Sequence, residues 1–471
     1  MELVLLISLL SILLGALIAF LLFGNYFRTK KSEVQAIAKP ELQATQKHSK
    51  PLQQISKKSH SKSQSHATDK DKIKRHHPLD ANTLKGHGDS VTALCFSSDG
   101  RSLATACADG VVRVFKLDDA SSKSFKFLRI NLPAGGHPTA VTFSDGASSI
   151  VVAAQTLSGS SLYMYGEENA KTANETKQQP KLPLPEIKWA HHKVHEKKAI
   201  LTLVGTTSSY GSADGSTIIA SCSEGTDIIL WHGKTGKILG NVDTNQLKNT
   251  MATISPNGRF IAAAAFTADV KVWEVMYSKD GSVKELSRVM QLKGHKSAVT
   301  WLCFTPNSEK IITASKDGSM RIWNINVYAY ACYRTRFFYC FSCKSNYIIS
   351  VVMTFLSVLE VRYHLDEDPK TLKVFPIPLC DSTGSTLNYD RLSISPDGRI
   401  LAATHASTLQ WLCAETGKVL DTSDKAHEGD ITGIAWAPTT IPMGDGLAMV
   451  LATAGADKKV KLWVAPPLQP S

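Results

Sequence analysis

One pattern occurs three times in this chain of 471 residues and limits what the chain can fold into. Its clearest copy runs from Leu292 to Asn324, where three short apolar runs are separated by a Pro-Asn turn and by a tight turn at Asp317-Gly318. Runs of about six residues between such turns predict three antiparallel strands. A sheet that small cannot bury both of its apolar faces alone. The chain must therefore supply similar sheets that pack against it.

Two further copies of the pattern run from Leu84 to Lys116 and from Ala426 to Trp463. In every copy the turn aspartate lies six residues before the aromatic residue that ends the third run. These pairs are Asp109 with Phe115, Asp317 with Trp323, and Asp457 with Trp463. Because the internal spacing is shared, the three segments are repeats of one structural unit and not merely segments of similar composition.

The Gly-His pair, the Asp turn and the closing Trp resemble the WD40 repeat family, in which each repeat forms a four-stranded blade of a β-propeller. Four more degenerate units end at Tyr165, Trp231, Trp273 and Trp411. We therefore predict an all-β, seven-bladed WD40 propeller over residues 78–467. Only VAPPLQPS follows Trp463, so the segment HPLDANTL before Gly86 is expected to form the last blade's fourth strand and close the ring.

A polar set recurs at equivalent positions of the three clear units. Its members are His87, Asp109, His295, Thr313, Asp317, Trp323, His427, Thr453, Asp457 and Trp463. The resemblance implies that each set is a buried hydrogen-bond network running from His through Asp and Ser or Thr to the Trp indole. In the fifth unit either Thr313 or Ser315 could supply the hydroxyl, and in the first unit Phe115 lacks the indole donor.

The same residue types superficially suggest a Ser-His-Asp hydrolase, but a catalytic site would not recur at the spacing of a repeat. The sequence also contains no nucleophile elbow, no phosphate-binding glycine loop and no complete set of metal ligands. His191, His192 and His195 are flanked by lysines that repel a cation, and Cys340 and Cys343 form a CxxC without a second pair. We therefore expect no enzyme activity, no cofactor and no metal.

The amino-terminal stretch from Leu3 to Phe23 contains no charged residue, and its 21 residues are enough to cross a bilayer core of about 30 Å. Its length and its bulky exit favour an uncleaved anchor over a cleavable signal peptide, so residues 1–27 are predicted to form a single transmembrane helix. Arg28, Lys30 and Lys31 follow directly, which predicts a cytosolic propeller. A glycan at Asn174, in an Asn-Glu-Thr sequon, would mean the opposite orientation.

Residues 28–77 are expected to form a disordered basic stalk. Between residues 28 and 80, 13 lysines and arginines stand against five acidic residues, without apolar periodicity. Attraction to anionic lipid is a second interpretation, and RNA binding through residues 47–75 is a third. That last range contains no aromatic side chain on which a base could stack.

Two inserts interrupt the predicted propeller, at residues 166–186 and 328–361. The first is polar and Pro-rich and is expected to lie outside the blades. The second, rich in aromatics and Cys and then apolar, differs in composition from everything around it. Its apolar run of about 13 residues is too short to span a bilayer. Joining Val327 to Arg362 would restore ordinary blade spacing. Our hypothesis is therefore that this segment is translated from a retained intron and is not part of the working fold.

With catalysis unsupported, the propeller is interpreted as a platform that binds other proteins through its surface loops. Ser90, Lys296, Trp301 and Asp430 lie near the turns that are expected to form the partner face. The order of anchor, basic stalk and propeller resembles that of a membrane-anchored WD40 family. The resemblance implies residence in the endoplasmic reticulum membrane and a scaffolding role in stress or translation signalling. RNA tethering by the stalk is the alternative function.

Overall fold

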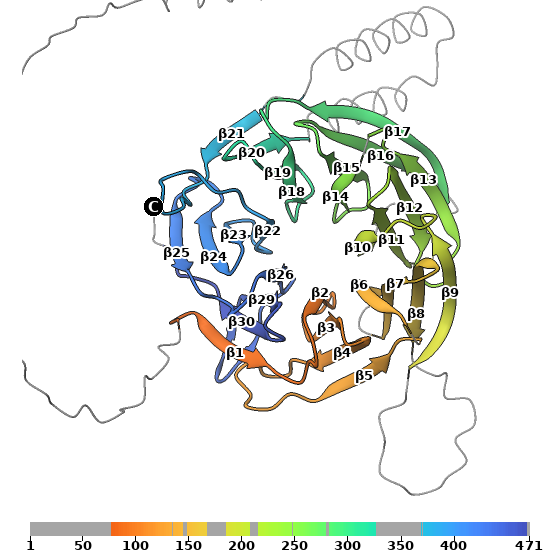
Figure 1. The fold of residues 1–471 in the computed structure, drawn as a ribbon, viewed down its shortest axis with the longest axis horizontal. Coiled ribbons are helices and arrows are strands. Elements are labelled where there is room, and N and C mark those ends of the chain that lie inside the picture. The colour runs from red at the N-terminus through yellow and green to blue at the C-terminus, as the bar shows by residue number, and fades with distance from the viewer. Residues whose placement is uncertain are drawn as a thin grey trace, which may run out of the picture. The chain divides into compact units, whose positions relative to one another are not determined.

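The computed structural model describes residues 77–133, 135–144, 148–166, 185–207, 215–246, 248–278, 282–325, 369 and 371–468. These residues form 30 β-strands and no helix. Seven antiparallel four-stranded sheets are arranged radially around a common centre (Figure 1). The prediction of a seven-bladed all-β propeller is thus confirmed.

The first three blades contain consecutive strands, each pairing with the next. They are β2 (Val91–Phe96), β3 (Ser102–Cys107), β4 (Val111–Lys116) and β5 (Phe127–Asn131); β6 (His137–Ser144), β7 (Ser149–Thr156), β8 (Gly159–Gly166) and β9 (Glu186–Val194); and β10 (Ile200–Thr207), β11 (Thr217–Ser223), β12 (Asp227–His232) and β13 (Ile238–Asp243).

The next three blades follow the same order. They are β14 (Asn249–Ile254), β15 (Phe260–Ala265), β16 (Val270–Tyr277) and β17 (Val283–Leu292); β18 (Val299–Phe304), β19 (Lys310–Ser315), β20 (Ser319–Asn324) and β21 (Thr371–Pro376); and β22 (Arg391–Ile394), β23 (Ile400–His405), β24 (Thr408–Cys413) and β25 (Val419–Ser423).

The seventh blade combines both ends of the propeller. Its inner strands are β26 (Ile431–Trp436), β29 (Val450–Gly455) and β30 (Val460–Val464), and its outer strand is β1 (Asp80–Leu84). β1 pairs antiparallel with β30, with Thr83 opposite Lys461 and Leu84 opposite Val460. The predicted closure of the ring is therefore confirmed. A short hairpin of β27 (Ile441–Met443) and β28 (Gly446–Ala448), which the sequence did not predict, is inserted between β26 and β29.

The apolar core lies between the blades. Among the described residues there are seven buried hydrophobic clusters, one for each pair of neighbouring blades. Successive side chains of a strand point to opposite faces, so Leu103 packs toward the seventh blade and Ala104 toward the second. Because both faces are covered, β3 is buried along its whole length and reads as SLATAC, without polar alternation.

Polar contacts also connect every pair of neighbouring blades near the first strands. In five of the seven pairs a threonine hydroxyl of one blade donates to a backbone carbonyl of the next. These contacts are Thr92 to Pro138, Thr202 to Ala252, Thr250 to Val299, Thr300 to Tyr389, and Thr432 to Val91. The other two pairs use the Gly205 amide, which donates to the Thr142 hydroxyl, and the Arg391 guanidinium, which donates to the Thr432 carbonyl.

Several predictions concern residues outside the described ranges. These are the anchor from Leu3 to Phe23, the stalk over 28–77 except His77, the sequon at Asn174, both cysteines of the CxxC, and almost all of the two inserts. No helix among the described residues is long and apolar enough to cross a bilayer. The strands that follow the inserts, β9 and β21, occupy the fourth position of their blades.

Candidate functional site

The fifth blade contains a complete hydrogen-bond network at the predicted residues. His295 bonds through Nδ1 to Asp317, at 2.9 Å, and through Nε2 to the Thr313 hydroxyl, at 2.8 Å. The Trp323 indole also donates to the Thr313 hydroxyl, at 2.9 Å. Thr313 is therefore the network hydroxyl, whereas Ser315 donates to the carbonyls of residues 297 and 298.

The seventh blade repeats this geometry at the seam of the ring. His427 contacts Asp457 at 2.9 Å and Thr453 at 2.8 Å, and the Trp463 indole donates to Thr453 at 2.8 Å. The side chains of Thr313 and Thr453 are completely buried. A substrate carbonyl cannot reach either hydroxyl, so the arrangement holds the strands together but is not built for nucleophilic catalysis.

The aspartates of both networks are strongly acidic. Burial alone would raise the pKa of Asp317, but hydrogen bonds from Ser319, from the Lys296 amide and from His295 outweigh it and lower the pKa to about 2. Asp457 behaves in the same way: burial opposes the shift, while His427 and two backbone amides lower its pKa to about 2. Each carboxylate therefore stays ionised at neutral pH and fixes the imidazole opposite to it.

A third complete network lies in the third blade, and the sequence analysis missed it. His195 contacts Asp227 through Nδ1 and the Ser221 hydroxyl through Nε2, at 2.8 Å, while the Trp231 indole donates to Ser221, also at 2.8 Å. The signal was present, because Ser221 lies ten residues before Trp231, as Thr313 lies before Trp323 and Thr453 before Trp463. The network was overlooked because Asp227 lies four residues before Trp231, and not six as in the clear repeats.

The neighbouring histidines of this segment have separate partners. His191 contacts the Gly236 carbonyl at 2.8 Å, and His192 contacts the Ser161 hydroxyl at 3.3 Å. The three imidazoles of the His191, His192 and His195 group thus do not converge. Over the described part of the chain, no cluster of three or more His, Cys, Asp or Glu residues is arranged to hold a metal ion.

The first blade has only part of the network. His87 contacts the Thr105 hydroxyl at 2.9 Å, but Asp109 pairs with Arg113, at 2.7 Å, and Phe115 has no N–H to donate. The Nδ1 atom of His87 is buried and has no hydrogen-bond partner among the described residues. Burial, reinforced by the charge of Arg113, lowers the pKa of His87 to about 4.

The four residues predicted for the partner face have different environments. Lys296 and Asp430 are exposed, and Ser90 is half-buried. Trp301 lies between two blades: its indole donates to the Leu392 carbonyl at 2.9 Å, and the Arg391 guanidinium lies over its ring. That this face binds a partner stays a prediction.

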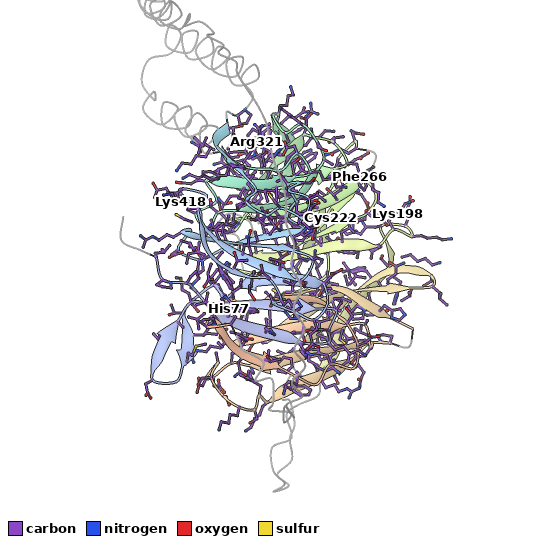
Figure 2. The ribbon with its side chains drawn as sticks, turned by 60° about the vertical axis from the view of Figure 1, so that its left-hand side comes forward. His77, Lys198, Cys222, Phe266, Arg321 and Lys418 are labelled. Carbon is purple, nitrogen blue, oxygen red and sulfur yellow. The ribbon has the colours of Figure 1, made fainter. Side chains whose placement is uncertain are left out.

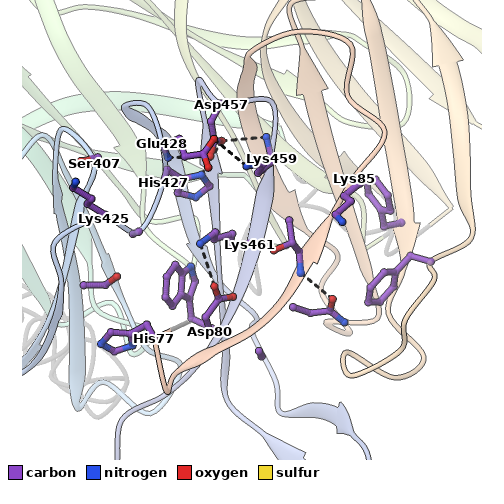
Figure 3. Close-up of a pocket in the computed structure, with 18 of the residues that line it drawn as sticks. His77, Asp80, Lys85, Ser407, Lys425, His427, Glu428, Asp457, Lys459 and Lys461 are labelled. Carbon is purple, nitrogen blue, oxygen red and sulfur yellow. Dashed lines mark hydrogen bonds and ion pairs between the residues drawn. The ribbon is translucent and has the colours of Figure 1, made fainter. Parts of the chain in front are cut away.

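A large cavity lies along β1 at the seam. It has a volume of about 1080 Å³ and is open to solvent (Figure 3). We call it the seam groove. Its walls come from β1, from residues 123–125 of the loop between β4 and β5, from residues 423–428, and from β30 with Asp457 and Lys459 before it. They include five lysines: Lys85, Lys123, Lys425, Lys459 and Lys461. Sequence reasoning could not find it, because it arises only when the two ends of the propeller meet.

Comparison with known proteins accords with this architecture. The family model described as WD domain, G-beta repeat matches residues 80–116, 286–324 and 417–464. Each matched segment begins in the outer strand of one blade, or two residues before it, and ends in the third strand of the next, so the sequence repeat is offset from the blade by one strand. These three segments of the chain are WD40 repeats.

Two relatives align with a large part of the chain. Transducin beta-like protein 2 of Mus musculus is 31% identical over 297 residues, which are 62% of this chain and 62% of that protein. Transducin beta-like protein 2 of Homo sapiens is 27% identical over 397 residues, which are 84% of this chain and 74% of that protein. The matched region thus spans somewhat less than two thirds of the mouse relative.

Proposed function

We propose that this WD40 protein is a scaffold, tethered to the endoplasmic reticulum membrane, that binds cytosolic proteins in stress or translation signalling. The observation that carries the proposal is that the side chains resembling a catalytic set are used in buried blade networks. What remains for function is the exposed surface of a rigid ring, and such surfaces bind macromolecules.

The cysteines support a cytosolic location for the propeller. Cys95, Cys107, Cys222 and Cys303 lie within strands. Figure 2 shows Cys222 inside the molecule, where its side chain is buried, and Lys198 at the periphery. All six cysteines of the described region are free thiols. Free thiols are typical of a reducing compartment. The positive residues that follow the predicted span from Leu3 to Phe23 favour the same side.

Proximity labelling tests the proposal directly. A biotin ligase fused to the carboxyl terminus of the full chain should label cytosolic proteins in intact cells, and Asn174 should carry no glycan. Labelling of luminal proteins, together with an endoglycosidase-sensitive mass shift that N174Q removes, would invert the topology. If carbonate extraction released the full chain from the membrane fraction into the soluble fraction, the proposed membrane tether would be contradicted.

RNA tethering by residues 47–75 is the alternative, and the observation that favours it is their excess of lysine. Ultraviolet crosslinking in cells distinguishes the two functions. Crosslinks that map to this range and weaken steeply as salt rises would support RNA tethering. An uncrosslinked full chain that still labels cytosolic proteins would support the scaffold.

A further inference from the structure

The seam groove carries an excess of positive charge. Lys459 pairs with Glu428 at 3.2 Å, and Lys461 pairs with Asp80 at 3.1 Å. The other three lysines of the groove are exposed and have no acidic partner in the described part of the chain. They are Lys85, Lys123 and Lys425. Figure 3 shows Lys85 and Lys425 on opposite sides of the groove, with Lys461 between them.

One wall of the groove is fixed before any ligand binds. The Asn82 side-chain amide donates to the carbonyls of Ala120 and Ser122, at 2.9 and 2.7 Å, and so holds the loop that carries Lys123 against β1. From the other side, the β27–β28 hairpin accepts a hydrogen bond from the Ala120 amide and donates one to the Asp119 carboxylate. A wall held at both ends loses little conformational entropy when a ligand binds.

We propose that the seam groove binds an extended acidic peptide segment of a partner protein. The inference rests on the proposed function, since it assigns a surface and a chemistry to the partner binding of the scaffold. Opposite charge attracts carboxylates to the unpaired lysines and speeds their encounter with the groove. The basic residues 28–77 of this chain have the same sign as the groove and so do not suit it.

Two features favour a peptide over a nucleic acid. Of the Phe and Trp side chains that line the groove, Phe115 and Trp463 are buried and Phe125 is half-buried, so none presents a fully open face on which a base could stack. Asp80 and Glu428 lie among the lysines and would repel a continuous row of phosphates. A peptide with spaced carboxylates can place each one beside a lysine and leave neutral residues beside the acids.

The test uses the full chain in nanodiscs of neutral lipid and a fluorescent peptide in which Glu alternates with Ser and Leu. Carbodiimide joins carboxylates to nearby amines, and mass spectrometry then maps the joined lysines. We expect the crosslinks to concentrate on Lys85, Lys123 and Lys425. We also expect K85E/K123E/K425E to weaken binding, measured by anisotropy, at least about tenfold.

The control variant K197E/K234E/K284E removes three exposed lysines from other blades and should bind within about twofold of the original chain. Since the basic segment 28–77 is unchanged in both variants, it contributes equally to each. If the charge-reversed groove variant does not fold, as judged by thermal melting, K85Q/K123Q/K425Q replaces it.

Three results would overturn the proposal: crosslinks spread evenly over exposed lysines, equal affinity of the two triple variants, or equal binding of the peptide with Gln in place of Glu. Displacement of the peptide by an oligouridylate of 12 nucleotides would show a general anion site, which also contradicts it. Proximity labelling by the groove variant distinguishes failure of the groove assignment from failure of the proposed scaffold function. If the same cytosolic neighbours are labelled, the scaffold stands and only the assignment of the groove fails.

Discussion

Two buried tryptophans isolate the contribution of one hydrogen bond. Trp323 and Trp411 are both fully buried third-strand residues. The Trp323 indole donates to Thr313, whereas the Trp411 indole N–H has no partner in the described region. Both substitutions to Phe remove the same ring volume, but only one removes a hydrogen bond.

We therefore expect W323F to lower the free energy of unfolding by about 1 kcal/mol more than W411F does. Urea denaturation of both variants measures the difference. His77 stacks on Trp411 at 5.8 Å, so any lost ring contact adds to the cost of W411F and makes the comparison conservative. Equal costs would mean that the network adds nothing beyond packing.

His87 should make stability depend on pH between 6.5 and about 4, a range that it shares with His295, whose pKa is also lowered by burial. The pKa of His87 is lowered from 6.5 to about 4 in the folded chain, so the unfolded chain binds a proton first as the pH falls. The contribution of neutral His87 to the free energy of unfolding is therefore fully present above pH 6.5 and is lost progressively as the pH falls to 4. The shift corresponds to a loss on the order of 3 kcal/mol.

The measurement is the urea midpoint at several pH values for the original chain and for H87Q. We expect the slope between pH 6.5 and 4 to be shallower in H87Q, because glutamine does not titrate. Asp317 and Asp457, with lowered pKa values, lose their stabilisation only as the pH falls below 3.8 toward 2, so their effect is separable. Identical slopes would exclude His87 as the cause.

For single residues, the sequence identified which residue types form the networks better than it identified their hydrogen-bond partners. The networks of His295 and His427 have regular spacing and could be predicted from it. The network of His195 could not be predicted in this way. His195 follows β9, which contains two other histidines, and its backbone is left-handed, with φ of 55°. That Asp109 pairs with Arg113 instead of His87 is a competition between two neighbours, and it depends on side-chain geometry that no spacing encodes.

Threonines of the first strands connect one element to the next. In the sequence they look like ordinary β-branched strand formers, and Thr92, Thr250, Thr300 and Thr432 each occupy the second position of their strand. Their acceptors lie on the following blade, up to 341 residues away in the case of Thr432. The recurrence could be seen in the sequence, but the acceptors could be assigned only after the ring was known.

The substitution T300V should therefore weaken the contact between the fifth and sixth blades. It removes the hydroxyl that donates to the carbonyl of Tyr389, a fully buried residue, at 2.7 Å. We expect the free energy of unfolding to fall by about 1 kcal/mol, as measured by urea denaturation.

The control is T139V, because the Thr139 hydroxyl donates to Ala153 of its own blade at 3.5 Å, close to the limit of a hydrogen bond. Its cost should stay below about 0.5 kcal/mol. If T139V is as costly as T300V, the hydroxyls do not act between blades.

For the molecule as a whole, the closure of the ring could be predicted because the last repeat lacks a fourth strand and the segment before the first repeat is left over. The seam groove could not, since residues 77–85, 123–125 and 423–463 meet only after closure. The β27–β28 hairpin was also missed, for its three-residue strands are too short to show a periodic pattern.

The connection between β20 and β21 bears on whether residues 328–361 belong to the working fold. Trp323 pairs with Thr371 across these strands, so the chain leaves β20 and enters β21 at the same end of the blade. Paired Cα atoms in antiparallel strands are about 5 Å apart, and a turn of a few residues spans that distance. The geometry of the fifth blade therefore requires no long connection.

We expect a chain in which Val327 is joined directly to Arg362 to express and to melt at a temperature at least as high as the full chain. As a control, deletion of residues 440–448 removes the hairpin that contains the fully buried Ile441 and bonds the loop that carries Lys123, and it should lower the melting temperature. Thermal melting followed by tryptophan fluorescence compares the three chains. If removal of 328–361 abolished folding while the hairpin deletion did not, the segment would be an essential part of the propeller.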